Sequence, residues 1–257
     1  MSPRRVAAII RHESILIAQD PLPVMILLVF PLIMMAFLKP TFGLALQAAG
    51  YPHANGAEQV VPGQAVANGF YVVGMTSFAF FAEYSWCTWD RLRSSQATTV
   101  EIIVGKATPR LGLSLAQFAA VFAIATPMLG LRIRGPVLAL VPLVIAFGVC
   151  LVLLGVVITA MCRTVQQANA LAFGGLVLFG AIGGALVPHE TLPSWARAVA
   201  PVTPTYWAMR GFRSIILGGR GLGAVLLPVA VLLGMGALCL AIAVARFRTA
   251  DQKIGFA

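Results

Sequence analysis

Residues 135–161 read GPVLALVPLVIAFGVCLVLLGVVITAM, a run of 27 residues without a charged side chain. A helix needs about 20 mostly apolar residues to cross the ~30 Å hydrocarbon core of a membrane. Unpaired backbone polar groups are too costly in lipid, so a spanning segment is either a helix or part of a closed barrel. Because the run is continuously apolar and lacks the alternation of barrel strands, it predicts a membrane-spanning helix.

Five further uncharged runs qualify as spans or come close. With the first, the predicted spans are 21–38, 66–82, 111–131, 135–161, 167–187 and 222–245. The composition agrees, with 60% hydrophobic and 10% charged residues and a mean hydropathy of +0.92. Soluble chains have about 45–50% apolar and about 25% charged residues. We therefore expect residues 1–257 to form one all-α integral membrane domain with six transmembrane helices, which excludes a soluble enzyme.

The net charge of +10 comes from Lys and Arg residues that are expected at the membrane surfaces. With six spans both termini lie on one side, and the connections on that side carry eleven Lys and Arg residues against seven on the other. Cytoplasmic loops are enriched in these residues, so both termini are expected in the cytoplasm. The excess of 15 Arg over 3 Lys, with abundant Ala and Gly, points to a bacterium, and hence to its inner (plasma) membrane.

Residues 1–20 are predicted to form an amphipathic helix in the membrane interface. Val6, Ile9, Ile10 and Ile17 make one apolar stripe, and Arg5 lies outside it. Such a helix places its basic side chains near anionic lipid headgroups.

The predicted spans contain few residues that could bind ions or take part in a reaction. None of the six runs contains Asp, Glu, Lys, Arg or His, and Glu83 lies just beyond the second run. Ion-coupled transporters usually carry such residues within their spans. The single Gly-Lys pair, Gly105-Lys106, is followed by Ala107 where a phosphate loop requires Ser or Thr. We therefore expect no catalytic residue, no metal site and no cofactor bound by this chain.

Two connections carry the remaining information. Residues 83–110 place Trp89, Leu92, Val100 and Ile103 at helical spacing among charged residues, which fits a short amphipathic cytoplasmic helix that docks a soluble partner. A basic loop with interfacial Trp would have the same composition.

The second connection is 188–221. Pro188, Pro193, Pro201 and Pro204 exclude one continuous helix. Since the segment is too apolar for a solvated loop, short re-entrant helices between spans 5 and 6 are expected.

The order of these features resembles the permease subunits of type-2 ABC exporters. In that family a pattern like Glu-Arg-Glu-x-Gly-Thr-x-Glu-Arg-Leu-Arg-x-Ser-Pro follows the second span, and a Gly-Lys pair comes later. The matching positions here are Glu83, Thr88, Asp90, Arg91, Leu92, Arg93, Ser95, Gly105 and Lys106. The departures are Tyr84, Ser85, Cys87 and Gln96. The Pro-rich segment 188–206 resembles the connection that precedes the family's last span.

The resemblance implies that Glu83, Thr88, the 90–93 block, Ser95 and Lys106 form a coupling region that docks a separate ATP-binding subunit. ATP and Mg would be bound by that partner. Two permeases, identical or paired, would form the pathway with two ATPases, in contact with membrane lipid and not with nucleic acid. The absence of charge in the spans favours a hydrophobic or amphipathic cargo, such as a drug, lipid or glycolipid.

Gly180 and Gly184 have the small-xxx-small spacing that lets helices approach closely. They are expected to pack within the bundle or against the second permease. Two other functions fit the composition: a non-transporting membrane anchor or assembly protein, and an ion-coupled secondary transporter.

The predicted topology can be tested by cysteine labelling. In a variant without the native cysteines, single cysteines at positions 55 and 195 should react with an impermeant maleimide added outside intact cells. A cysteine at position 253 should react only after the cells are opened. Labelling of positions 55 and 253 from the same side would contradict six spans.

Overall fold

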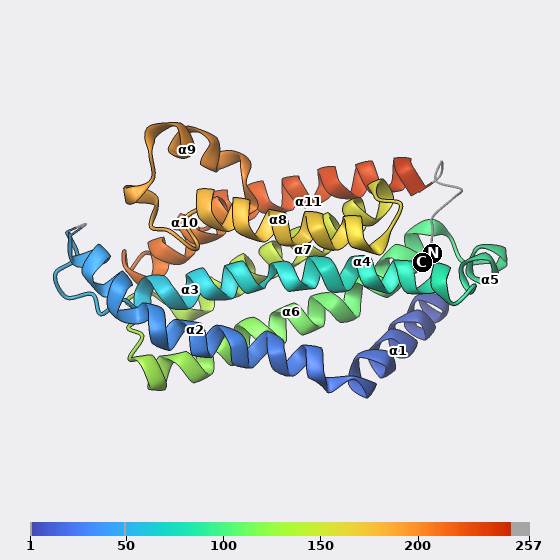
Figure 1. Cartoon of the computed structure of the whole chain (residues 1–257), viewed down its shortest axis with the longest axis horizontal. Coiled ribbons are helices and arrows are strands. Elements are labelled where there is room, and N and C mark those ends of the chain that lie inside the picture. Colours follow the sequence, from blue (N-terminus) through green and yellow to red (C-terminus); the bar gives the residue numbers. More distant parts are fainter. Residues whose placement is uncertain (1, 49, 248–257) are drawn as a thin grey trace.

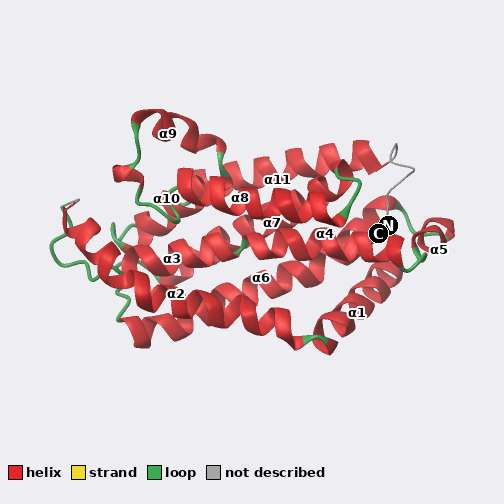
Figure 2. Ribbon diagram, in the orientation of Figure 1, coloured by secondary structure: helices red, strands yellow, loops and turns green. Residues whose placement is uncertain are grey.

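The computed structural model describes residues 2–48 and 50–247, which fold into helices with no strand (Figure 2). Six segments of this described part are long and apolar enough to cross a membrane. They are α2 (Pro21–Ala48), α3–α4 (Ala57–Ser85), α6 (Thr99–Leu129), η1–α7 (Val137–Met161), α8 (Val165–Ile182) and most of α11 (Leu226–Arg246). They run along the long axis of the molecule (Figure 1), which confirms the predicted all-α architecture with six spans.

Three spans are longer than predicted, because charged residues that we took as their ends lie inside helices. α2 continues past Lys39 and Pro40 to Ala48. α3 (Ala57–Asn68) begins nine residues before the predicted start at 66. α6 begins at Thr99 instead of 111, where a capping box between Thr98 and Glu101 fixes its first turn. The expectation that residues 99–110 form a connection was therefore wrong.

The second span is the centre of the bundle. All twelve residues of α3 are buried, and α4 (Phe70–Ser85) continues it beyond Gly69. A Cβ at Gly69 would lie 2.8 Å from Leu151 Cδ1 of α7 (Leu140–Met161). Elements α2, α6, α7, α8 and α10 pack around this span, so it is covered by protein on nearly every side (Figure 1).

The fifth span ends earlier than predicted. α8 stops at Ile182, and Gly184 lies in the following turn with φ +85°. Gly180 and Gly184 therefore do not share a helix face, and their predicted spacing motif is wrong. Gly183 makes the close approach instead, since a Cβ there would lie 1.8 Å from Thr205 Oγ1. The lack of a side chain at Gly183 lets the end of α8 touch the start of α10.

Short helices fill the connection between the fifth and sixth spans, as predicted. They are η2 (His189–Thr191), α9 (Ser194–Val199), η3 (Ala200–Val202), α10 (Pro204–Ile216) and η4 (Leu222–Ala224). In α10 the Thr203 hydroxyl caps the first turn and Phe212 is buried. The Phe212 ring stacks on Phe118 and Phe122 of α6, with centroids 6.1 and 5.6 Å apart.

The two ends of the bundle differ in structure. α1 (Pro3–Gln19) lies obliquely at one end, near α5 (Trp89–Ser94), and α9 and α10 lie at the other (Figure 1). Asp20 Oδ1 accepts a hydrogen bond from Leu22 N at 3.4 Å where α1 turns into α2. Position 253, used in the labelling experiment, lies outside the described residues.

Candidate functional site

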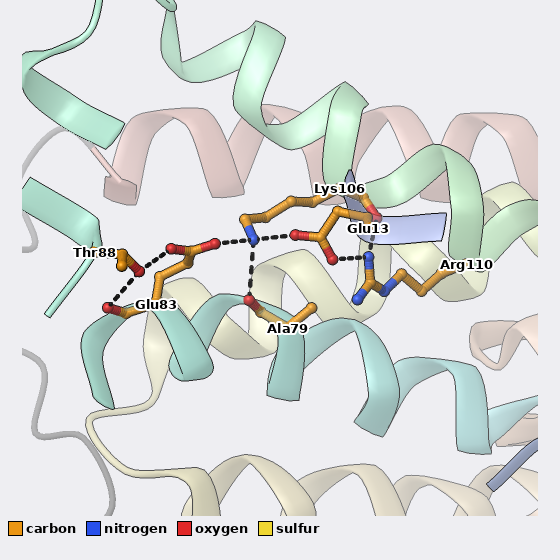
Figure 3. Close-up of polar contacts among 6 residues, drawn as sticks. All are labelled: Glu13, Ala79, Glu83, Thr88, Lys106 and Arg110. Atoms are coloured by element: carbon orange, nitrogen blue, oxygen red, sulfur yellow. Dashed lines mark hydrogen bonds and ion pairs between the residues drawn. The ribbon is translucent and has the colours of Figure 1, made fainter. Parts of the chain in front are cut away.

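Four ionisable side chains meet inside the end of the bundle that carries α1 and α5. We call Glu13, Glu83, Lys106 and Arg110 the buried charge cluster (Figure 3). Lys106 Nζ lies 2.5 Å from Glu13 Oε1 and 2.7 Å from Glu83 Oε1, and Arg110 Nη1 lies 2.5 Å from Glu13 Oε2. The side chains of Glu13 and Lys106 are 2% exposed, that of Arg110 is 8% exposed and that of Glu83 14%.

Three helices bring these charges together. Glu13 comes from α1, Glu83 from the last turn of α4, and Lys106 and Arg110 from one face of α6, four residues apart. Lys106 Nζ also donates to Ala79 O at 3.2 Å, so its ammonium group has three acceptors for its three protons. Arg110 Nη1 donates to Lys106 O at 3.1 Å. Two acids and two bases leave the cluster without net charge.

The cluster is joined to the turn that follows α4. The single hydroxyl proton of Thr88 is shared between Glu83 Oε2 (Figure 3) and Glu83 O, which lies 3.3 Å from Thr88 Oγ1. The rings of Tyr84 and Trp89 stack with centroids 4.7 Å apart. Because Thr88 directly precedes α5, its contact with Glu83 joins α5 to the buried charge cluster.

The residues predicted for partner docking divide into two groups. Glu83 and Lys106 lie within the buried charge cluster, and Lys106 is only 1% exposed, so it cannot touch a soluble partner in this structure. Arg91 and Ser95 are exposed on α5 and at its C-terminal end. The side chains of Asp90, Leu92 and Arg93 lie outside the described part of the structure, although their backbone belongs to α5.

Two cluster members were missed from the sequence. Arg110 was counted as a basic residue of the connection, and Glu13 was not singled out within the amphipathic helix. The signal for Arg110 was its spacing of four from Lys106, which places both cations on one face once α6 is known to be helical there. No comparable signal marks Glu13, whose partners are 93 residues or more away in the chain.

A cavity of about 740 Å³ lies beside the cluster, between α1, α4 and α8 and the start of α2. Its walls are aromatic and aliphatic along α4 and α8, and it extends along α4 from Phe70 to the carboxylate of Glu83. Arg110 and Glu13 reach it from the cluster, and Asn169 from α8. The cavity therefore has one charged end and a long apolar wall.

These features define a helical, multi-pass membrane protein with a charged junction at one end of its spans. The chain belongs to the ABC-2 type transporter family, whose pattern matches residues 4–217. It thus carries a membrane domain of the ABC-2 type, as the resemblance in sequence implied.

Three relatives carry specific names. The chain is 29% identical over 133 residues, 52% of its length and 36% of the relative's, to the "Probable multidrug ABC transporter permease YbhR" of Escherichia coli (strain K12). It is 28% identical over 155 residues (60% and 40%) to the "Linearmycin resistance permease protein LnrN" of Bacillus subtilis (strain 168). It is 26% identical over 174 residues (67% and 24%) to the "ABC transporter G family member 20" of Dictyostelium discoideum. The matches cover two fifths or less of each relative.

The pairing of Lys106 predicts a large effect of its removal. Lys106→Met leaves the carboxylate of Glu83 without its ion partner and that of Glu13 with one fewer, which should lower the free energy of unfolding by about 3–5 kcal/mol. Thermal unfolding of the detergent-solubilised chain would measure this. Arg91→Met, an equal change at an exposed position, is the control. Identical unfolding temperatures for the two variants would contradict the buried pairing.

Proposed function

We propose that this chain is the membrane subunit of an ATP-driven exporter and carries a hydrophobic or amphipathic compound such as a drug, lipid or glycolipid. The observation that carries the proposal is that three features meet at one end of the bundle: α5 with its exposed Arg91, the buried charge cluster, and the cavity next to the cluster. The names of the bacterial relatives, which mention multidrug transport and linearmycin resistance, support a cargo of this kind.

In this proposal α5 receives the ATP-binding subunit, which binds ATP and Mg. Separating buried ion partners costs several kcal/mol, so a push on α5 displaces α1, α4 and α6 together. Glu83 and Lys106 then belong to the coupling machinery as internal links between helices. Thr88 connects them to α5 through the hydrogen bond that its hydroxyl shares between two oxygens of Glu83.

The same displacement changes the cavity, because Glu13, Glu83 and Arg110 line it. A cargo with an apolar body would lie along Phe70, Phe78 and Phe173, and its polar group would face the charged end. Binding at the cluster and movement of the cluster are thereby linked, which is what an ATP-driven cycle requires.

The assembly and orientation follow from the same proposal. Two permeases, identical or paired, would work with two ATPases in the inner membrane of a bacterium, with both termini of this chain in the cytoplasm. The end of the bundle with α1 and α5 would then face the ATPase.

Charge reversal on α5 tests partner docking. Arg91→Glu combined with Arg93→Glu should abolish most co-purification of the ATP-binding subunit, because it replaces two positive charges at the proposed contact with negative ones. The measurement is the ATPase-to-permease ratio after gentle extraction. Arg197→Glu, at the opposite end of the bundle, should leave the ratio unchanged. An unchanged ratio in the double variant would remove α5 from the contact and favour an anchor or an ion-coupled transporter.

Filling the cavity tests cargo binding. A Cβ at Gly74 meets only ordinary contacts, 3.7 Å from Asn169 Oδ1 and 3.9 Å from Ala172 Cβ, so Gly74→Leu should fold and extend into the cavity. ATP-dependent uptake of a fluorescent amphipathic dye into inverted vesicles should fall about tenfold, as expected for roughly 1–3 kcal/mol of overpacking against a ligand. Gly174→Leu on α8, which has open space around its Cβ, is the control. Equal uptake by both variants would exclude the cavity from transport.

A further inference from the structure

A second cavity, of about 460 Å³, lies at the opposite end of the bundle, between the turn after α2, the end of α8, η2 and α10. Its polar lining is dominated by arginine. Arg210 and Arg213 come from α10, and Arg220 follows it. Neither the predicted coupling region nor the apolar cavity includes these residues.

The charges in this cavity are unbalanced. Arg213 Nη2 is paired with Glu190 Oε1 at 2.7 Å. Burial opposes the charged form of Glu190, but its hydrogen bond to Arg213 and the charge of Arg213 outweigh this and lower the pKa of the carboxyl. Arg210 stacks on the Trp207 ring at 5.3 Å. Among the described residues no carboxylate lies within 4.0 Å of the Arg210 or Arg220 guanidinium. Arg210 and Arg220 are both exposed, so their two positive charges are open to an anion from outside the described part of the chain.

An unpaired nitrogen faces the same region. His189 Nδ1 is buried, and no hydrogen-bond partner for it exists within the described part of the chain. The His189 ring lies 5.3 Å from the Tyr206 ring, and both line the cavity. Desolvation lowers the pKa of His189, and the charges of Arg213 and Arg197 lower it further against the opposing charge of Glu190. A neutral imidazole at neutral pH can donate to a ligand oxygen.

Exposed apolar side chains lie at the same end of the bundle, on α9 and η3. Trp195 is 65% exposed on α9, and Val202 is 71% exposed on η3. Trp207 Nε1 donates to Pro201 O at 2.8 Å and so ties η3 to the ring on which Arg210 stacks. Figure 1 shows α9 standing away from the spans at this end. Apolar side chains beside guanidinium groups match the boundary between lipid tails and headgroups.

We propose that this cavity binds the phosphate of an anionic phospholipid from the leaflet at this end of the bundle. Arg210 and Arg220 hold the phosphate oxygens through the paired N–H groups that suit phosphate geometry. His189 donates to the headgroup, and Trp195 and Val202 contact the first part of the tails. The proposal does not depend on the transport function.

The test is lipid titration of the detergent-solubilised full chain, followed by native mass spectrometry. The probes are phosphatidylglycerol, phosphatidylcholine and inorganic phosphate. The wild-type chain should retain phosphatidylglycerol more tightly than phosphatidylcholine. Arg210→Gln or Arg220→Gln should each weaken phosphatidylglycerol binding about tenfold, as expected for the loss of a charge-assisted hydrogen bond. The double variant should bind both lipids equally.

Controls separate the site from general charge effects. Arg132→Gln removes one exposed positive charge outside the cavity and should leave binding unchanged. Arg213 is left intact because it holds Glu190. Val202→Ser should weaken lipid binding at an unchanged unfolding temperature. The proposal is overturned if Arg132→Gln weakens binding as much as Arg210→Gln, or if the wild-type chain does not discriminate between the two lipids. Binding of inorganic phosphate as tight as that of phosphatidylglycerol would overturn the assignment to lipid.

Discussion

At the end of the bundle near α5, the arrangement of the helices is constrained by one buried positive charge, the ammonium group of Lys106. Lys106 is 1% exposed, and a charge in such a place is tolerated only when every proton has an acceptor. Glu13, Glu83 and Ala79 O supply those acceptors from α1 and α4. The amphipathic helix is therefore bound to the spans by ion pairs as well as by apolar contacts, and its place is fixed by the charge it neutralises.

The sequence predicted the spans well and their ends poorly. Continuous apolar runs identify α7 and α11, with each end within five residues of the predicted run, because a membrane-spanning helix needs such a run. Charge was the wrong marker of the boundary in α6, since Lys106 and Arg110 are neutralised by residues distant in sequence. Hydropathy depends only on residues that are neighbours in the sequence, so it gives no sign of an ion partner 93 positions away. The charge cluster therefore required the structure, although its lysine was noticed beforehand.

The ends of helices and the turns after them were also hard to predict from the sequence, for a related reason. The glycines near the end of α8 suggested a packing motif, but a motif of this kind needs helical spacing throughout, and the helix stops at Ile182. The true close contact, between Gly183 and Thr205, depends on α10 folding back across the bundle. Proline positions predicted the broken helices between the fifth and sixth spans correctly, because the effect of proline on a helix is local.

The neutrality of the buried charge cluster has an electrical consequence. A unit charge that crosses a membrane held at 100 mV gains or loses about 2.3 kcal/mol. Because two carboxylates accompany two cations, the four side chains of the buried charge cluster together add no net charge to a movement along the membrane normal. A displacement of the cluster as a unit would therefore do no net electrical work against the membrane potential.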